Sequence, residues 1–99
     1  MTSVGDVIAD GDSIATTALL TVQPPAGEEW VIHNIYHASD VTLIKTDGAY
    51  AIEFDSEPGA GLYAKYAFHL TNTDYLTVRN DDAETMDIAF DGVVTKAAP

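Results

Sequence analysis

The sequence contains no cysteine among its 99 residues. Disulfide bonds, thiolate catalysis and zinc sites built on cysteine are therefore excluded, while the redox state of its compartment stays open. No apolar run approaches the ~20 residues that a membrane-spanning helix needs, so we expect no membrane partner. The first residues carry no basic patch ahead of an apolar segment. We therefore expect no signal peptide, and a protein that is used in a cytoplasm or released by lysis.

Basic residues are also scarce. The sequence has 4 lysines and arginines against 16 aspartates and glutamates, which gives a formal charge of -12 at pH 7. The basic residues are Lys45, Lys65, Arg79 and Lys96. So acidic a protein repels nucleic acid and anionic membranes, and we expect neither as a partner. Acidity of this kind keeps a protein soluble, and it is common where salt is high or where a dense array must not aggregate.

The length and the apolar content fit a single folded domain. The 99 residues, 46% of them hydrophobic, suffice for one core and are too few for two. Residues 1–16 mix glycine, aspartate and serine with scattered apolar side chains, which is typical of an arm or an irregular edge. We therefore predict an N-terminal arm over 1–16, with at most a brief pairing at 7–9, and one domain over 17–99.

The rest of the chain is organised around residues 23–36. Pro24, Pro25 and Gly27 break the chain, and residues 29–36 then supply the β-branched and aromatic side chains that suit a half-buried strand. Because one strand is unstable alone, several others must cover its apolar face. We predict that Trp30 lies at the centre of the resulting core.

The clearest local signal is a hairpin. Asp47-Gly48 is a dipeptide favoured in tight turns between strands, and the residues that follow it alternate in polarity. Tyr50, Ile52 and Phe54 share one face of that alternation, and we predict that Ile52 and Phe54 lie in the core. Other strands are expected over 16–22, 41–46, 62–70, 75–79 and 85–96.

Short strands separated by turns, with no window of helical period, predict an all-β fold. The expected architecture is an antiparallel β-sandwich or a small jelly-roll-like barrel of about seven to eight short strands. Gly92, inside the last strand, is expected at a bulge or at a close approach of two backbones. The predicted core consists of apolar residues that alternate toward one face of these strands: Trp30, Ile32, Leu43, Ile52, Phe54, Leu76, Val78, Ile88 and Phe90.

Three histidines are the first candidates for chemistry. His33 and His37 fall on the same face of a regular strand, and with His69 they would make a three-histidine metal site. Ordinary polar positions on a half-exposed strand explain them better, so we predict no metal and no other cofactor.

Other catalytic signals are weaker still. The acidic runs at 10–12 and 81–84 lack the spacing of an EF-hand loop and are interpreted as solvated turns. No serine lies in a nucleophile elbow, and no glycine-rich loop precedes a helix that would hold phosphate. We therefore predict that the protein is not an enzyme.

Three stretches of the sequence carry a resemblance to a known class of proteins. They are the turn and strand over 22–32, the Thr-Asn-Thr corner over 71–76 and the closing Asp-Gly strand over 90–94. With the hairpin at Asp47-Gly48, they extend over most of residues 17–96. On these residues the chain resembles small virion proteins of tailed bacteriophages, and most of all the capsid decoration, or head cement, proteins.

This resemblance implies a structural function. Decoration proteins bind the outside of the capsid, often as trimers, so the expected partners are the major capsid protein and further copies of this chain. The protein would stabilise the expanded head, on the capsid surface of a virion assembled in the host cytoplasm. Four apolar residues of the predicted arm are expected to contact the capsid or a neighbouring subunit: Val4, Val7, Ile8 and Ile14.

Two alternatives stay open, because a fold does not fix a function. A tail or fibre accessory protein, or a carbohydrate-binding module, would use the same sandwich, with exposed aromatic side chains as its sugar platform. A small metal-dependent enzyme is the third reading, and it requires His33, His37 and His69 to hold a metal ion.

Overall fold

The computed structural model describes residues 3–97, which form nine strands and no helix. Residues 1–2 of the expected arm and 98–99 of the expected domain lie outside this range. Nothing in the described part of the chain is a helix long and apolar enough to cross a membrane. In chain order the strands are β1 (Val7–Ile14), β2 (Leu19–Val22), β3 (Glu29–His37), β4 (Val41–Asp47), β5 (Tyr50–Glu57), β6 (Gly61–Tyr63), β7 (Phe68–Leu70), β8 (Asp74–Asn80) and β9 (Met86–Lys96).

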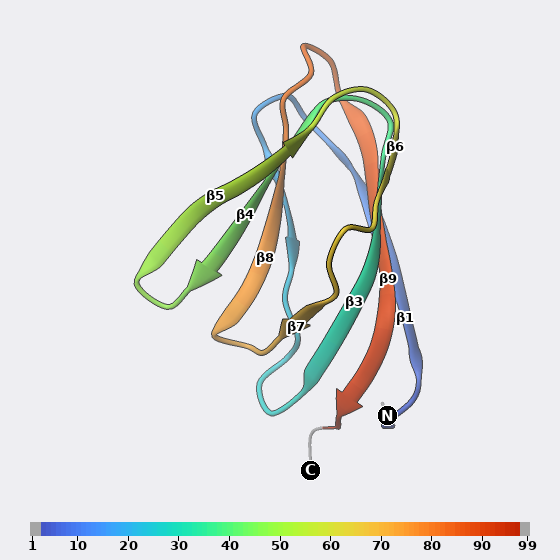
Figure 1. The fold of residues 1–99 in the computed structure, drawn as a ribbon, viewed down its shortest axis with the longest axis vertical. Coiled ribbons are helices and arrows are strands. Elements are labelled where there is room, and N and C mark those ends of the chain that lie inside the picture. The colour runs from blue at the N-terminus through green and yellow to red at the C-terminus, as the bar shows by residue number, and fades with distance from the viewer. Residues whose placement is uncertain (1–2, 98–99) are drawn as a thin grey trace.

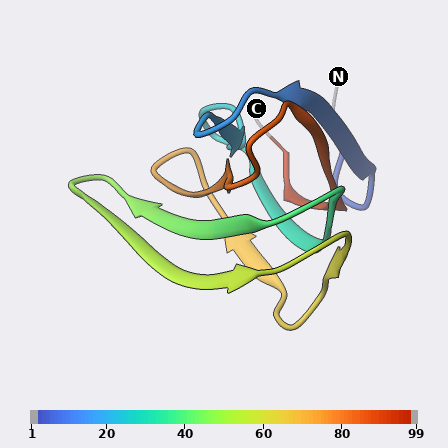
Figure 2. The same cartoon turned by 90° about the horizontal axis from the view of Figure 1, so that it is seen from above.

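The strands form two antiparallel sheets that pack face to face (Figure 1). The first sheet has the order β1-β9-β3-β6, with β7 also paired to β3, and the second has the order β2-β8-β4-β5. The predicted antiparallel β-sandwich is confirmed. Strand β1 forms one edge of the first sheet, and β5 forms the edge of the second sheet at the opposite end of the sandwich (Figure 2).

The core is built around β3, as the Pro-Pro-Gly turn and the strand after it predict. Trp30 is buried, and its ring stacks on Phe90 of β9 with 6.2 Å between the ring centroids. Its indole nitrogen donates a hydrogen bond to Glu28 Oε1 at 2.7 Å, which satisfies the one polar group that the ring buries. Seven residues of the predicted core are buried: Trp30, Ile32, Leu43, Leu76, Val78, Ile88 and Phe90.

The prediction that Ile52 and Phe54 lie in the core is wrong. Ile52 is 60% exposed and Phe54 is 38% exposed. Both belong to the edge strand β5, and the strands opposite it, β6 and β7, have three residues each. The alternation of β5 is as expected, but too little of the facing sheet extends over these side chains to bury them.

The expected arm over 1–16 contains a strand. Residues 7–14 form β1, which pairs with β9 along its whole length, from Val7 opposite Val93 to Ile14 opposite Met86. Ile14 is buried in the core, and Ile8 packs partly against it. Asp10 and Asp12 lie opposite buried residues of β9 yet stay exposed at the rim. Charged residues turned inward on an edge strand hinder its pairing with another chain.

The expected strand over 62–70 is divided into β6 and β7, which with β1 makes nine strands instead of seven to eight. Gly92 lies at a close approach of two backbones, as predicted. A Cβ atom built on it would lie 2.1 Å from the carbonyl oxygen of Val31 in β3. The pairing of β3 with β9 is irregular directly beyond this contact, between Ile32 and Asn34.

Candidate functional site

The second sheet extends beyond the first at the β4–β5 hairpin, which projects away from the sandwich (Figure 1). Asp47 pairs with Tyr50 across a two-residue loop, and Gly48 occupies its first position with φ of +50°. A type II′ turn takes glycine at this position, which explains why the chain reverses so tightly here. The inner face of the hairpin is left largely uncovered as a result.

A groove of about 370 Å³ lies along this inner face, between β5 and the segment that carries β7. Phe54 approaches Phe68 with 5.6 Å between ring centroids, and the ring of Tyr66 lies edge-on to Phe68 at 6.5 Å. Aromatic side chains in such arrangements pack favourably beyond the area that they bury. The hairpin groove, as we name it, is lined by Lys45, Ile52, Phe54, Tyr66 and Phe68.

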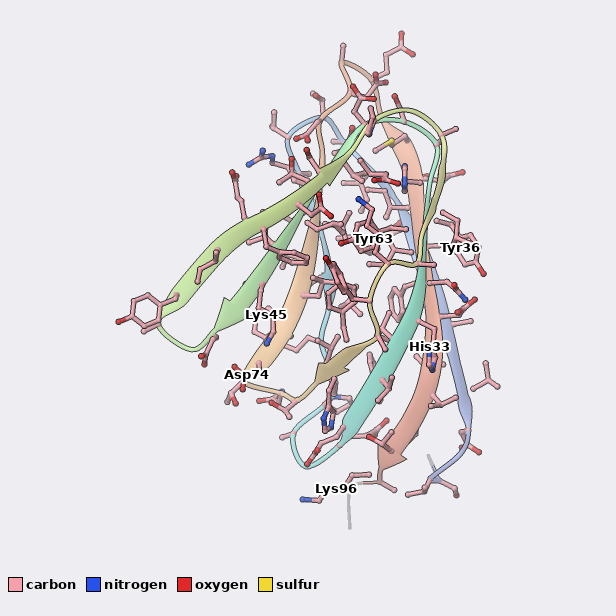
Figure 3. The ribbon with its side chains drawn as sticks, viewed as in Figure 1. His33, Tyr36, Lys45, Tyr63, Asp74 and Lys96 are labelled. Atoms are coloured by element: carbon pink, nitrogen blue, oxygen red, sulfur yellow. The ribbon has the colours of Figure 1, made fainter. Side chains whose placement is uncertain are left out.

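A hydrogen bond holds the two sheets together beside the hairpin groove. The hydroxyl of Tyr63, a buried residue of β6, donates to Asp55 Oδ2 of β5 at 2.8 Å. Lys65 Nζ lies 3.4 Å from the same oxygen. The hydrogen bond from Tyr63 lowers the pKa of Asp55, while burial and the neighbouring carboxylate raise the pKa of Tyr63. Figure 3 shows Tyr63 lying between the two sheets.

Charges of both signs meet near the hairpin tip. Lys45 Nζ lies 3.9 Å from Asp74 Oδ1, and Figure 3 shows both residues at the outer ends of β4 and β8. Asp74 also pairs in register with Asp47. The two carboxyl groups share a hydrogen bond, which raises the pKa of Asp47. The charge of Lys45 thus acts on two neighbouring carboxyl groups.

A second apolar surface lies on the outer face of the first sheet, at the opposite end of the sandwich. Val7 of β1, Val93 of β9 and Val31 of β3 are neighbours across the three strands, and Val7 is 75% exposed. We name these three residues the valine row. On the same outer face Ala9 and Gly11 of β1 and Ala89 of β9 have small side chains, whereas Asp91 lies opposite Ala9, directly beside Val93.

The four predicted contact residues divide between the surface and the interior. Val7 is an exposed member of the valine row, and Val4 is exposed in the segment ahead of β1. Ile8 packs partly against the core, and Ile14 is buried in it with 6% of its surface exposed. The prediction that Ile14 contacts another protein is therefore wrong, because that residue is a core position of β1.

The three histidines are not gathered. The irregular pairing of β3 places His33 at the bulge, so that His33 is exposed while His37 is buried. His37 Nδ1 lies 2.9 Å from the carbonyl oxygen of Ser39, and His69 Nε2 lies 3.1 Å from Glu29 Oε1 on the surface. Within residues 3–97 there is no group of three or more histidines and carboxylates that is able to hold a metal ion.

The outer face near His33 carries a polar cluster centred on Asp91. Asn34 Nδ2 donates to one carboxylate oxygen at 2.8 Å, and the hydroxyl of Tyr36 donates to the other at 2.6 Å. The hydrogen bond to Asp91 raises the pKa of Tyr36. Figure 3 shows Tyr36 pointing away from the sandwich. Both oxygens of Asp91 are thereby engaged within the chain.

The acidic runs are also engaged locally. Asp10 and Asp12 each accept a hydrogen bond from the backbone amide of the following residue, at 2.8 Å. Asp81 accepts from Thr42 and from Arg79. Asp81 is partly buried, which opposes ionisation, but these two donors outweigh that effect and lower its pKa. The carboxylates of the run at 81–84 therefore help to fix a corner of the fold.

The hairpin groove was not predicted from the sequence. Its members Lys45 and Tyr66 have no distinctive spacing, and they meet only because β5 overhangs the short strands β6 and β7. The available signal was the wholly apolar face of Tyr50, Ile52 and Phe54 in a strand next to a tight turn. Such a face indicates either core or contact surface, and the sequence does not separate the two.

No protein-family model matches this chain, and no curated protein matches it in sequence. The fold and the surfaces therefore define its class. The chain is a small all-β sandwich that exposes two separate apolar surfaces, the hairpin groove and the valine row, at opposite ends.

Proposed function

We propose that this protein is a structural component of a tailed-bacteriophage virion, which binds the outside of the capsid and stabilises the expanded head. Its partners in this role are the major capsid protein and further copies of the chain, in a homotrimer on the virion surface. The observation that carries the proposal is the pair of apolar surfaces at opposite ends of one sandwich. A protein that reinforces a shell must bind two neighbours at once, and this arrangement supplies one surface for each.

The valine row is the surface that we assign to the capsid. It lies on the outer face of the first sheet, where Val7 at its edge is largely exposed, as is Val4 ahead of β1. Exposed apolar patches rimmed by polar residues commonly mark protein interaction sites. One contact of this size is weak. When linked copies bind several sites of a closed shell at once, the later contacts form within one assembly, so the overall attachment is stronger although no new type of contact is made.

The charges support a role on the outside of a particle. All four basic side chains form ion pairs: Lys45 with Asp74, Lys65 with Asp55 and Glu57, Arg79 with Glu53 and Asp81, and Lys96 with Glu29. The formal charge of -12 therefore lies on a surface without a cluster of free cations. Such a surface favours neither DNA nor anionic lipid, and it keeps crowded copies from aggregating.

The test is binding to expanded capsid shells from the virus that encodes this chain. We expect the wild-type protein to cosediment with the shells and to raise their melting temperature. Val7→Asp should lower the affinity for the shells at least tenfold, because it places a charge in the valine row. Leu19→Asp is the matched control: Leu19 is also an exposed residue of an edge strand, but in the other sheet.

Point variants are preferable to deletion of residues 1–16, because that deletion removes β1 and the buried Ile14. Failure of the wild-type protein to bind shells would contradict the proposal. Equal binding by the Val7→Asp and Leu19→Asp variants would contradict the assignment of the valine row.

Exposed tyrosines favour a second candidate, a carbohydrate-binding or tail accessory module. Tyr66, which lines the hairpin groove, is 60% exposed, and Tyr50, next to the hairpin turn, is 69% exposed. Sugar rings stack on such side chains. Lys45 is the only charged residue that lines the groove, so the groove has few polar groups to orient a sugar. Titration with a panel of bacterial surface glycans, followed by NMR, would separate the two candidates through shifts at these tyrosines.

A further inference from the structure

The edge strands of the two sheets are protected to different degrees. An edge strand exposes backbone groups that pair readily with another chain, and proteins counter this with short edge strands, inward charges, lysine or proline. Here β2 has four residues, and β6 and β7 have three each. β1 is longer, but the carboxylates of Asp10 and Asp12 accept the amides of Gly11 and Ser13, which would otherwise be available to a neighbouring chain.

Strand β5 is a long edge strand without this protection in the half next to the turn. It has eight residues, includes neither lysine nor proline, and within residues 3–97 pairs only with β4. Opposite residues of antiparallel strands alternate between pairs that exchange hydrogen bonds and pairs that do not. Asp47 and Tyr50 close the two-residue loop as a bonded pair. The N–H and C=O groups of Ala51 therefore point to the free edge, as do those of Glu53 two positions further on.

The other half of β5 is closed to such pairing. The amide of Ser56 donates to Asp55 Oδ1 at 2.8 Å, which is the device that also covers the edge of β1. The pairing of β5 with β4 shifts between Leu43 and Ile44, and this leaves Phe54 as an extra residue on β5. A bulge of this kind interrupts a ladder. The stretch at residues 50–53, which we name the open edge, is thus the part of β5 that is able to pair with a further strand.

The hairpin groove lies along one face of the open edge. Ile52 belongs to the open edge and lines the groove with Phe54 and Tyr66. In a strand added beside β5, every second side chain would point to this face of the sheet and cover the groove. Those side chains should be apolar, because Lys45 is the only charged residue that lines the groove. Peptides that bind by strand addition obtain affinity from backbone hydrogen bonds and specificity from alternate side chains in this way.

The charges beside β5 show what the remaining side chains of such a strand should be. Each of three cations is shared by two carboxyl groups: Lys45 by Asp47 and Asp74, Lys65 by Asp55 and Glu57, and Arg79 by Glu53 and Asp81. One negative charge is left at each group after the internal ion pairs are counted. Complementarity of charge therefore favours a basic segment, and it disfavours the acidic β5 of a second copy.

We propose that the open edge of β5 binds an extended segment of a partner protein by strand addition, and that this segment alternates apolar side chains over the hairpin groove with lysine or arginine. Its backbone bonds to Ala51 and Glu53, and its basic side chains lie near the carboxyl groups that flank β5. The open edge and the valine row lie at opposite ends of the sandwich, so both can be occupied at once. The inference stands apart from the proposed function, because its test needs no capsid.

The first test is NMR titration of the wild-type chain with a blocked peptide, Lys-Val-Lys-Val-Lys-Val-Lys. Hydrogen exchange at the amides of Ala51 and Glu53 should slow, the side-chain signals of Ile52 should shift, and the affinity should fall as salt is raised. Two control peptides should bind about tenfold more weakly or not at all: one with glutamate in place of each lysine, and one with the same residues in two blocks. Equal binding of the block peptide would show a charge effect alone and overturn the proposal.

Backbone methylation of the peptide tests strand addition without any change to the protein. Only alternate amides of an added strand face β5, so N-methylation of the lysines and N-methylation of the valines should differ. One of the two peptides should lose binding and the other should keep it. Equal affinities of the two methylated peptides overturn the proposal.

A substitution in β5 tests the same ladder from the other side. Ala51→Pro removes an amide that faces the free edge, where an edge strand tolerates proline, and should weaken peptide binding about tenfold. Ala9→Pro is the matched control, because Ala9 is also an exposed alanine of an edge strand, two positions before the outward amide of Gly11. A folded Ala51→Pro variant that binds like the wild type overturns the proposal. So does slow exchange of Ala51 and Glu53 in concentrated protein without peptide, which would assign the open edge to a second copy.

Discussion

The hydroxyl of Tyr63 donates a hydrogen bond to Asp55 across the open side of the sandwich, with 2.8 Å between the two oxygens. Tyr63 belongs to β6 in one sheet and Asp55 to β5 in the other. This contact therefore links the base of the projecting hairpin to the opposite sheet.

Tyr63→Phe should loosen this link. The ring stays in place, but the carboxylate of Asp55 loses its main donor, so its pKa should rise toward the ordinary value of about 3.9. NMR titration of the aspartate carboxyl carbons measures that change. Tyr66→Phe is the control, since that exposed hydroxyl is not the donor to Asp55. An unchanged Asp55 titration in Tyr63→Phe would show that the hydrogen bond is unimportant.

The same pair predicts how stability depends on pH. The pKa of Asp55 is lowered in the folded chain, so its contribution is complete above the unfolded pKa, about 4, and is lost as the pH falls through the lower folded value. The pKa of Tyr63 is raised, so its contribution is complete below about pH 10 and is lost above it. Thermal melts across the pH range should show both declines in the wild type. Tyr63→Phe should lack the alkaline decline that this phenol causes.

Trp30→Ala should remove much of the stability of the domain. The indole is buried against Phe90 and bonded to Glu28, and truncation of a buried tryptophan costs about 3–5 kcal/mol. The free energy of unfolding of a small domain is only about 5–15 kcal/mol, so the variant should be unfolded or nearly so at 37 °C. Urea unfolding followed by circular dichroism measures the loss. A variant that melts within a few degrees of the wild type would refute the central role of Trp30.

Thr17→Gly should stabilise the chain. Thr17 has φ of +64° in the turn between β1 and β2, a conformation that is strained for a β-branched residue, and its amide donates to the Asn80 carbonyl at 2.9 Å. Glycine relieves the strain and keeps the amide donor. The free energy of unfolding should rise by about 0.5–1 kcal/mol once the cost of glycine's greater freedom in the unfolded chain is subtracted. Thr16→Gly is the matched control and should destabilise, because the Thr16 hydroxyl donates to the Asp82 carbonyl. Equal losses from both substitutions would exclude strain at Thr17.

Much of the fold was predictable because local signals agree with one another. Three local signals each specify one element: the Pro-Pro-Gly turn specifies β3, the turn at Gly48 specifies the β4–β5 hairpin, and the alternation of polarity specifies β9. Pairing with neighbouring strands is consistent with each of them. β1 was predicted as an arm because Asp10, Gly11 and Asp12 have the composition of a turn. They are tolerated in a strand because that strand is an edge, where side chains reach water even from the inner face.

The candidate surfaces were less predictable, because they depend on where one sheet ends relative to the other. The pattern of Tyr50, Ile52 and Phe54 defines a face, and only the shortness of β6 and β7 decides that it is exposed. His33 and His37 would share a face on a regular strand, but the bulge between them separates the two. Bulges and overhangs are tertiary features, which explains why the sequence identified the strands better than the surfaces.

Gly92→Ala should be among the most damaging of the small substitutions in this chain. A methyl group at Gly92 would lie 2.1 Å from the Val31 carbonyl oxygen and 2.8 Å from the Ile32 Cα atom, so the backbones of β3 and β9 must separate. Overpacking of this kind costs about 1–3 kcal/mol, and we expect the upper part of that range because backbone atoms cannot move aside as a side chain can. The melting temperature should fall by about 10 °C.

Gly61→Ala is the matched control, because Gly61 is also a strand residue of the first sheet and its added Cβ would meet only His37 Cε1, at 3.9 Å. Its melting temperature should change by no more than a few degrees. Both variants lose the same glycine flexibility in the unfolded chain, so the difference between them isolates the close approach of β3 and β9. If the two variants melt together, then the contact at Gly92 relaxes without cost, and the bulge at His33 is the place where the strands adjust.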